Sequence, residues 1–219
     1  MTKHFQRELQ NIKKMILSLG AIVEERVQMA KTAIEDADAH LAEQIIKKDY
    51  EIDEMEVEVE EECLKILALH QPVAVDLRFL VAVIKINNDL ERIGDQAVNI
   101  AQRVEFMTEQ KPHRFCFDYD KMAQKAQIML KASLDALVNL DVDLALKVCR
   151  MDDEVDALKH VAYDKIKAAM EGESEDHGYY INMLLISRHL ERLADHATNI
   201  AEEVIYMIEG EIVRHGRLE

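Results

Sequence analysis

Apolar residues recur along the chain at intervals of three and four, which is the spacing of one buried face of an α-helix. Between residues 3 and 36 this pattern continues without a break, and polar residues fill the other positions. The period predicts a long amphipathic helix rather than a strand. Its apolar stripe consists of Ile12, Met15, Ile16, Leu19, Val23, Val27, Ala30 and Ile34.

Two further helices follow in the first half of the chain. Asp38 is a good N-cap for a helix that runs to about Leu69, because its short carboxylate can accept hydrogen bonds from the next backbone amides. The segment 70–72 then breaks the chain, and Pro72 suits the first turn of a third helix that ends near Thr108. Each of the long helices has about 30 residues and is therefore roughly 45 Å long.

The second half of the chain repeats this plan. Helices are predicted at about 118–139, 142–170 and 175–209, with Asp141 as the N-cap of the middle one and a turn at 172–174. Because short loops make neighbouring helices run antiparallel, each half should fold as a three-helix bundle. We therefore predict an all-α protein of two tandem, internally duplicated three-helix bundles, residues 1–110 and 111–219, with the boundary in the segment 109–113.

A repeated motif connects the two halves. LERIGDQAVNIA (residues 90–101) returns one hundred residues later as LERLADHATNIA (residues 190–201), with eight of twelve positions identical. A unit of about one hundred residues is longer than a solenoid repeat and indicates a duplicated domain. Other positions return after 103 residues: Asp38, Asp49 and Asp53 match Asp141, Asp152 and Asp156.

The repeat preserves pairs of acids four residues apart, which places both carboxylates of a pair on one face of a helix. The middle helix of each half carries one pair and the third helix carries another. If these helices pack with their axes about 8–10 Å apart, four carboxylates converge, and they must take up protons or hold cations. The first set is Asp49, Asp53, Glu91 and Asp95, and the second set is Asp152, Asp156, Glu191 and Asp195.

Carboxylate oxygens form a hard ligand set, which suits Mg, Mn, Ca or iron better than an ion that prefers thiolates. Asn99 and Asn199 lie one turn beyond the acids of the third helices and are possible additional ligands. The alternative role for each asparagine is a buried bridge between helices. The alternative for the acids is a solvated helix face, as expected for residues 58–62, but such a face does not need the same residues in both copies.

The histidines mostly fail the comparison between the copies. His160 is in register with the second acid set, but its counterpart in the first half is Val57. His196 corresponds to Gln96, which is more typical of a packing or capping residue. No nucleophile and base are shared by the two copies, so no arrangement for covalent catalysis is apparent.

Composition and charge limit the classes of partner. The 219 residues carry 43 acids against 27 lysines and arginines, and the formal charge of −16 disfavours binding to nucleic acid or to anionic lipid. The three cysteines form no C-x-x-C pair, which fits unpaired thiols in a reducing compartment. The most apolar run, residues 73–86, contains charges and is too short to span a bilayer. We expect a cytoplasmic protein without membrane insertion.

The motifs resemble the PhoU family of bacterial regulators of phosphate-specific transport and of the phosphate-starvation response. The resemblance rests on QPVAVDLR (residues 71–78), on both copies of the LER motif and on EGEIVRH (residues 209–215), and it covers nearly the whole chain. It implies two similar three-helix bundles. It also implies that (E/D)-x-x-x-D motifs hold multinuclear iron or zinc clusters in some members, and in this chain those motifs are the eight acids named above.

The resemblance further implies a regulatory role without enzymatic activity. Such proteins couple the phosphate ABC transporter, through its ATPase, to a sensor histidine kinase, and they keep the response off when phosphate is plentiful. Two alternatives are a metalloenzyme, such as a phosphatase that uses a metal-bound water, and a purely structural helical scaffold. The lack of a shared nucleophile argues against the first alternative, and the acids preserved between copies argue against the second.

One helix segment predicts association. Residues 73–86 are apolar almost all round, which is more apolar surface than a slim three-helix bundle can cover. We expect a homodimer or higher oligomer, or else a tight contact between the two bundles that buries Phe79, Leu80 and Val83.

Overall fold

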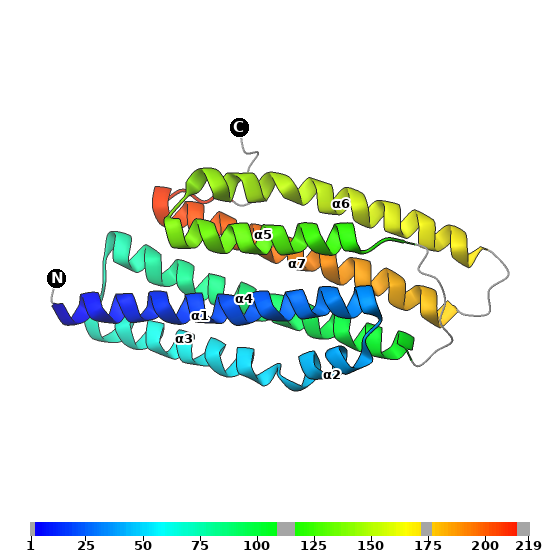
Figure 1. The fold of residues 1–219 in the computed structure, drawn as a ribbon. Coiled ribbons are helices and arrows are strands. Elements are labelled where there is room, and N and C mark those ends of the chain that lie inside the picture. Colours follow the sequence, from blue (N-terminus) through cyan, green and yellow to red (C-terminus); the bar gives the residue numbers. More distant parts are fainter. Residues whose placement is uncertain (1–2, 109–116, 172–176, 214–219) are drawn as a thin grey trace.

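The computed structural model describes residues 3–108, 117–171 and 177–213, and every regular element in these ranges is an α-helix. The first half contains α1 (Lys3–Asp36), α2 (Ala39–Lys47), α3 (Tyr50–His70) and α4 (Ala74–Thr108), and the second half contains α5 (Asp120–Asn139), α6 (Val142–Met170) and α7 (His177–Glu209). Figure 1 shows two elongated bundles lying side by side, as predicted. The predicted boundary at 109–113 and the predicted turn at 172–174 lie outside the described residues.

The loops that open the middle helix of each half have the same construction. Asp38 accepts hydrogen bonds from the amides of His40 and Leu41, and Asp141 accepts one from the amide of Leu144, so both predicted N-caps are confirmed. The residue before each cap has a left-handed backbone, with φ of 49° at position 37 and 54° at position 140. Two loops with the same cap and the same backbone conformation support an internal duplication.

The middle helix of the first half is broken, and this differs from the single helix predicted to run to Leu69. Helix α2 ends at Lys47, and the amide of Ile52 bonds to the carbonyl of Asp49, three residues back, which tightens the chain locally. Just after the break, Glu51 pairs with the Arg26 guanidinium of α1, which is only 2 % exposed. A guanidinium buried to this degree needs a carboxylate partner, and the first turn of α3 supplies it. Helix α6 continues unbroken through the equivalent positions.

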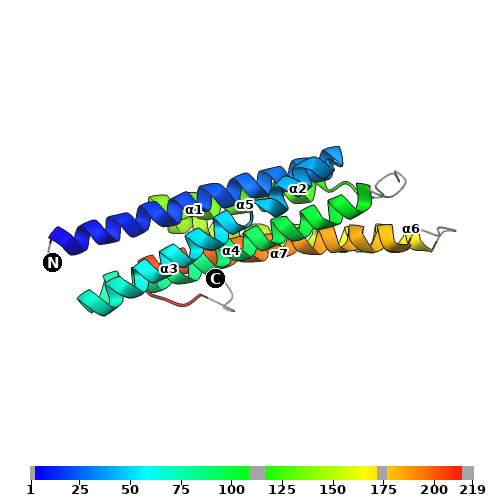
Figure 2. The same cartoon turned by 90° about the horizontal axis from the view of Figure 1, so that it is seen from below.

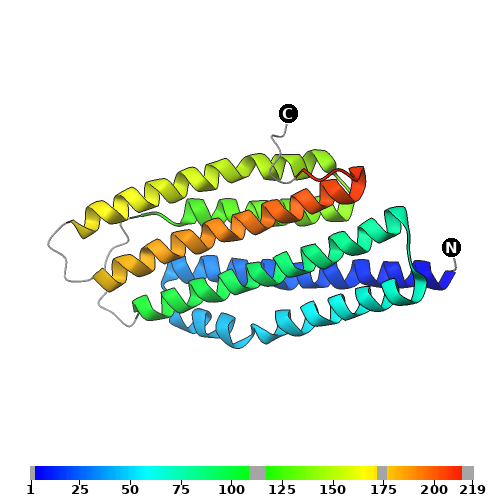
Figure 3. The same ribbon diagram turned by 180° about the vertical axis from the view of Figure 1, so that it is seen from behind.

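Helices α4 and α7 form the most extensive helix–helix contact and join the two halves. Figure 3 shows them crossing the middle of the molecule side by side, with α6 on one flank and α2 and α3 on the other. The apolar segment 73–86 is buried in part, since Phe79, Leu80 and Val83 are buried while Val73, Val75 and Leu77 are exposed. The structure contains a contact between the bundles, which is one of the two expected ways to cover this segment, and the homodimer stays a prediction.

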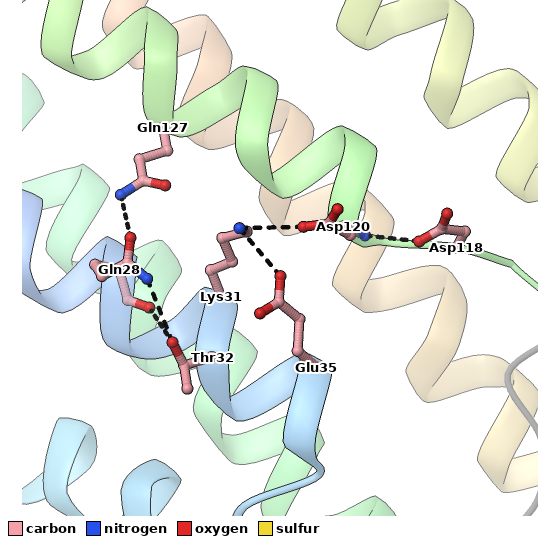
Figure 4. A network of polar contacts seen from close by, with 7 residues as sticks. All are labelled: Gln28, Lys31, Thr32, Glu35, Asp118, Asp120 and Gln127. Carbon is pink, nitrogen blue, oxygen red and sulfur yellow. Dashed lines mark hydrogen bonds and ion pairs between the residues drawn. The ribbon is translucent and has the colours of Figure 1, made fainter.

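A second contact between the halves is polar and lies between α1 and α5. Lys31 of α1 forms ion pairs with Glu35 on its own helix and with Asp120 at the start of α5, each at 3.1 Å (Figure 4). One turn before Lys31 on α1, the side chain of Gln28 accepts a hydrogen bond from the side-chain amide of Gln127 on α5. These contacts fix how the two bundles lie against each other along the edge opposite the grooves described below.

Figure 2 shows the molecule from below, with α3 alongside α4 and the α2–α3 break beside the middle of α4. None of the helices in the described ranges is long and apolar enough to cross a membrane.

Candidate functional site

The structure brings the first set of acids together between α3 and α4. Asp49 lies in the break before α3, Asp53 lies in the first turn of α3, and Glu91 and Asp95 lie one turn apart on α4. Burial raises the pKa of Asp49, Glu91 and Asp95, and repulsion from their acidic neighbours raises it further. Asp53 on α3 raises the pKa of Asp95 and of Glu91 on α4, and Asp95 raises the pKa of Asp49, so the carboxylates on the two sides face one another.

The second set assembles in the same way between α6 and α7. Burial raises the pKa of Asp195 to about 6, with further contributions from Glu191, Asp152 and Asp156. The pKa of Asp152 is raised by burial and then by Asp156, and the hydroxyl of Thr198 partly opposes this by donating a hydrogen bond to its carboxylate at 3.3 Å. Each half therefore contains one acidic cluster, on the outer flank of the α4–α7 pair.

The two clusters differ in one charged residue. In the second cluster the ammonium of Lys159 on α6 donates to Glu191 and lies 3.6 Å from Asp156. The position 103 residues earlier is Glu56. Asn87 holds this residue by donating to its backbone carbonyl at 2.8 Å and to its carboxylate at 3.1 Å.

The donor chemistry of the first cluster fits a hard cation. Its carboxylates repel one another, and those of Asp49, Glu91 and Asp95 are half-buried while that of Asp53 is exposed, so a bound cation would relieve the repulsion. Over the described ranges, however, no three His, Cys, Asp or Glu side chains are arranged to hold a metal ion as they stand. Binding would therefore require these side chains to change rotamer and draw together.

The cysteines offer no soft ligands in the described part of the chain. Cys63 is buried and Cys149 is half-buried, and both are unpaired. Burial raises the pKa of Cys63 to about 12 and that of Cys149 to about 11, so that neither is a thiolate at neutral pH. Cys116 lies outside the described residues.

Asn199 and His196 both serve the contact between the bundles. The Asn199 amide donates to Asp89 of α4 at 3.1 Å, which is the helix-bridging role that was the alternative to metal ligation. His196 Nδ1 donates to the same carboxylate at 2.8 Å. At the matching place in the other half, His189 Nδ1 donates to Gln96 at 2.9 Å. Sequence comparison missed Asp89 and His189 because it searched for residues that are the same in both copies.

The remaining candidates lie beside the clusters. Asn99 is half-buried one turn after Asp95 on α4. His160 is exposed on α6 and lines a groove next to the second cluster. Lys159 was not predicted as part of a site, and the signal that identifies it is the reversal of charge at this position between the copies.

Each bundle carries a groove on this side of the molecule, and the two grooves differ in charge. The second groove is lined by Glu191 and Asp195 of the second cluster, whereas the first groove is lined by Glu56 and by none of the four acids of the first set. The first has a volume of about 670 Å³ and is lined by four carboxylates and one lysine. The second has a volume of about 740 Å³ and is lined by a lysine, two arginines and two carboxylates. Five lining positions match between the copies: Glu56 and Lys159, Glu60 and Tyr163, Ile84 and Leu184, Lys85 and Leu185, and Asn88 and Arg188.

Comparison with known proteins agrees with this architecture. The PhoU domain family model matches twice, at residues 16–104 and 119–204, so that one match falls in each bundle. The chain is 37 % identical to the phosphate-specific transport system accessory protein PhoU homolog of Pseudomonas aeruginosa over 98 % of this chain and 89 % of that protein. It is 35 % identical to the homolog of the same name from Clostridium acetobutylicum, over 96 % of this chain and 97 % of that protein.

Solved structures show the same fold. The crystal structure of PhoU from Pseudomonas aeruginosa superposes with a TM-score of 0.91 at 36 % identity, covering 94 % of this chain and all of that one. The phosphate transport system regulatory protein PhoU from Streptococcus pneumoniae gives a TM-score of 0.88 at 31 % identity, with 95 % of this chain and 99 % of that chain covered. Family model, relatives and fold agree over nearly the whole length, and the chain belongs to the PhoU family.

Proposed function

We propose that this protein is an accessory regulator of phosphate-specific transport, which keeps phosphate uptake and the phosphate-starvation response low when phosphate is plentiful. The observation that carries the proposal is the full-length match to relatives named as accessory or regulatory proteins of phosphate transport. The role needs no catalysis by this chain. A rigid double bundle with two different grooves is suited to contacting other proteins.

The partners we propose are the ATPase of the phosphate ABC transporter and a sensor histidine kinase, both met in the cytoplasm, with the protein acting as a homodimer. The different charges of the two grooves support binding to more than one partner, because a surface of one sign disfavours partners of the same sign.

We also propose that the acidic clusters are metal sites, with iron or zinc as the ions and Mg or Mn as alternatives. The donors are the eight acids of the two sets, with Asn99 as a possible further ligand. Support comes from the half-buried carboxylates that raise one another's pKa, since a bound cation removes this repulsion. The bound metal would supply a fixed positive charge on the flank of each bundle.

The function is tested by deleting the gene in the source organism and measuring phosphate uptake together with a starvation-response reporter at high phosphate. We expect both to rise in the deletion strain and to return to normal when the parent gene is restored. A double variant, Glu91→Ala with Asp95→Ala, should restore regulation only in part, with normal circular dichroism. Unchanged uptake and reporter activity in the deletion strain would contradict the regulatory role, and a phosphatase screen of the purified protein tests the enzymatic alternative.

A further inference from the structure

The two acidic clusters can be compared position by position, because buried residues of α3 and α6 match at the same spacing as the acids. Ile52 corresponds to Val155, and Val59 corresponds to Ala162, and all four side chains are fully or almost fully buried. The matched core fixes the rotation of α3 and α6 about their axes. Position 56 and position 159 therefore lie on the same turn and face the same side of their bundles.

Lys159 places a cation inside the second cluster. Its ammonium spans from α6 to α7, where it donates to Glu191, and it lies 3.6 Å from Asp156. Both acids belong to the four that the duplication predicts as metal ligands. The pair is partly shielded from water, since the side chains of Lys159 and Glu191 are 35 % and 16 % exposed. An ion entering this cluster must displace the ammonium or bind beside a charge of its own sign.

The first cluster has the opposite arrangement. Glu56 adds a fifth carboxylate to the four predicted acids, and Asn87 holds it toward α4. Within the described ranges, no lysine or arginine lies within ion-pair distance of these five acids, and the positive charges that act on them do so from further away: Arg92 acts on Glu91 and Asp95, and Arg26 acts on Asp49. Counting only the acids and Lys159, the formal charge is −5 in the first cluster and −3 in the second, and Arg92 and Arg192 follow Glu91 and Glu191 in both copies and leave this difference unchanged.

We infer that Lys159 is the resident cation of the second cluster, so that the protein binds a metal ion at the first cluster and not at the second. The inference rests on the proposed metal-binding role and narrows it to one flank of the molecule. The two clusters then have different roles, because the first binds a metal ion and the second is occupied by the Lys159 side chain. The acids preserved in the second cluster serve to hold Lys159 and to tie α6 to α7.

The test measures metal content per full-length chain. Protein is stripped with chelator, loaded with Mn²⁺ alone, and analysed by titration calorimetry and elemental analysis. We expect one tight ion per chain in the parent. Lys159→Glu, which copies the first cluster, should raise this to two, and Lys159→Gln should also open the second site with weaker affinity. Glu56→Lys, which copies the second cluster, should remove the ion from the first site.

Lys147→Glu is the matched control, because it makes the same charge change at an exposed position of α6 and should leave one ion per chain. Circular dichroism of every variant shows that the bundle is folded. Two ions per chain in the parent would overturn the inference and leave the proposed metal sites standing. No ion in the parent or in any variant would overturn the metal sites and the inference together. A second ion gained with Lys147→Glu would show that net charge, rather than Lys159, controls binding, and would also overturn it.

Discussion

Asp89 of α4 accepts hydrogen bonds from His196 at 2.8 Å and from Asn199 at 3.1 Å, both across the contact between the two bundles. The contact has a counterpart at the positions shifted by one hundred residues, where His189 donates to Gln96. Residue 89 thus meets residue 196, and residue 189 meets residue 96, which is the pattern of two antiparallel helices related by a local twofold axis (Figure 3). The duplication therefore built the contact between the halves as well as the halves themselves.

Replacing Asp89 with Ala should lower the free energy of unfolding by about 1–3 kcal/mol, because two partly buried donors on α7 lose their acceptor. The carboxylate is 13 % exposed and the His196 side chain 18 % exposed, so water replaces these bonds poorly. Urea unfolding at neutral pH measures the change. Asp164→Ala, at an exposed position of α6, should cost little. Equal effects of the two substitutions would show that the contact contributes nothing to stability.

Much of the fold could be predicted because it is encoded locally. The apolar period placed the helices, and the short carboxylates of Asp38 and Asp141 marked the starts of the two middle ones. The break at Asp49 could not be predicted, because the matching segment of the second half is a continuous helix. Its cause is non-local, since the partner of Glu51 is Arg26 on another helix.

The candidate site also has features that could be predicted from the sequence and features that could not. Repetition of the acids showed which carboxylates face one another, because a spacing of four defines a helix face. The two clusters differ by the reversal of charge between Glu56 and Lys159. A comparison of the two copies that looks only for identical residues does not detect this difference. The pairing of α4 with α7 could not be predicted from the sequence either. An apolar helix indicates burial but does not indicate the surface against which the helix packs.

Gly94 and Ile52 should be energetically coupled. A Cβ atom built at Gly94 would lie 2.8 Å from Ile52 Cδ1, whereas the second half has Ala194 and Val155 at these positions. Gly94→Ala alone should be near neutral, because a helix-propensity gain of about 1 kcal/mol offsets the overlap. In the Ile52→Val background, the same substitution should stabilise the protein, with a coupling of about 1–2 kcal/mol.

A double-mutant cycle followed by chemical unfolding measures this coupling. Ile52→Val alone should cost about 0.5–1.5 kcal/mol, because it removes one buried methylene. Strict additivity of the two substitutions would contradict the steric explanation for glycine at position 94.

The Arg26–Glu51 ion pair should respond unequally to loss of its two partners. The Arg26 side chain is 2 % exposed and that of Glu51 is 36 % exposed. Glu51→Ala leaves the buried guanidinium with only the exposed carboxylate of Glu25 nearby and should cost about 3 kcal/mol. Arg26→Met leaves a carboxylate that water can reach and fills the space with an apolar chain, so it should cost less than about 1.5 kcal/mol.

Thermal and urea unfolding of both variants test this order. Glu25→Ala is the control, since Glu25 lies 3.8 Å from the same guanidinium but its side chain is 63 % exposed. A larger loss for Arg26→Met than for Glu51→Ala would show that packing of the arginine, rather than its charge, decides stability here.

His189 should make the protein less stable as the pH falls. Burial lowers the pKa of His189 to about 4 from its usual 6.5, and the positive charges of Arg103, Arg192 and Arg188 lower it further. Between these two pH values the unfolded chain binds a proton that the folded chain does not. The stabilisation is therefore complete above pH 6.5 and is lost as the pH falls toward 4, by an amount of order 1 kcal/mol once solvent screening is allowed for.

The measurement compares urea midpoints of the parent and His189→Gln at pH 7.5 and pH 5, with chelator present so that metal binding does not contribute. Glutamine can still donate a hydrogen bond to Gln96 but does not titrate. Since the carboxylates are common to both proteins, their titration cancels in the difference, and the parent should lose more stability than the variant on going to pH 5. His40→Gln, at an exposed position where the side chain is 78 % accessible, should follow the parent at both pH values. Parallel behaviour of parent and His189→Gln would mean that His189 ionises as readily in the folded chain as in the unfolded one, and that the arginines around it are too well screened to matter.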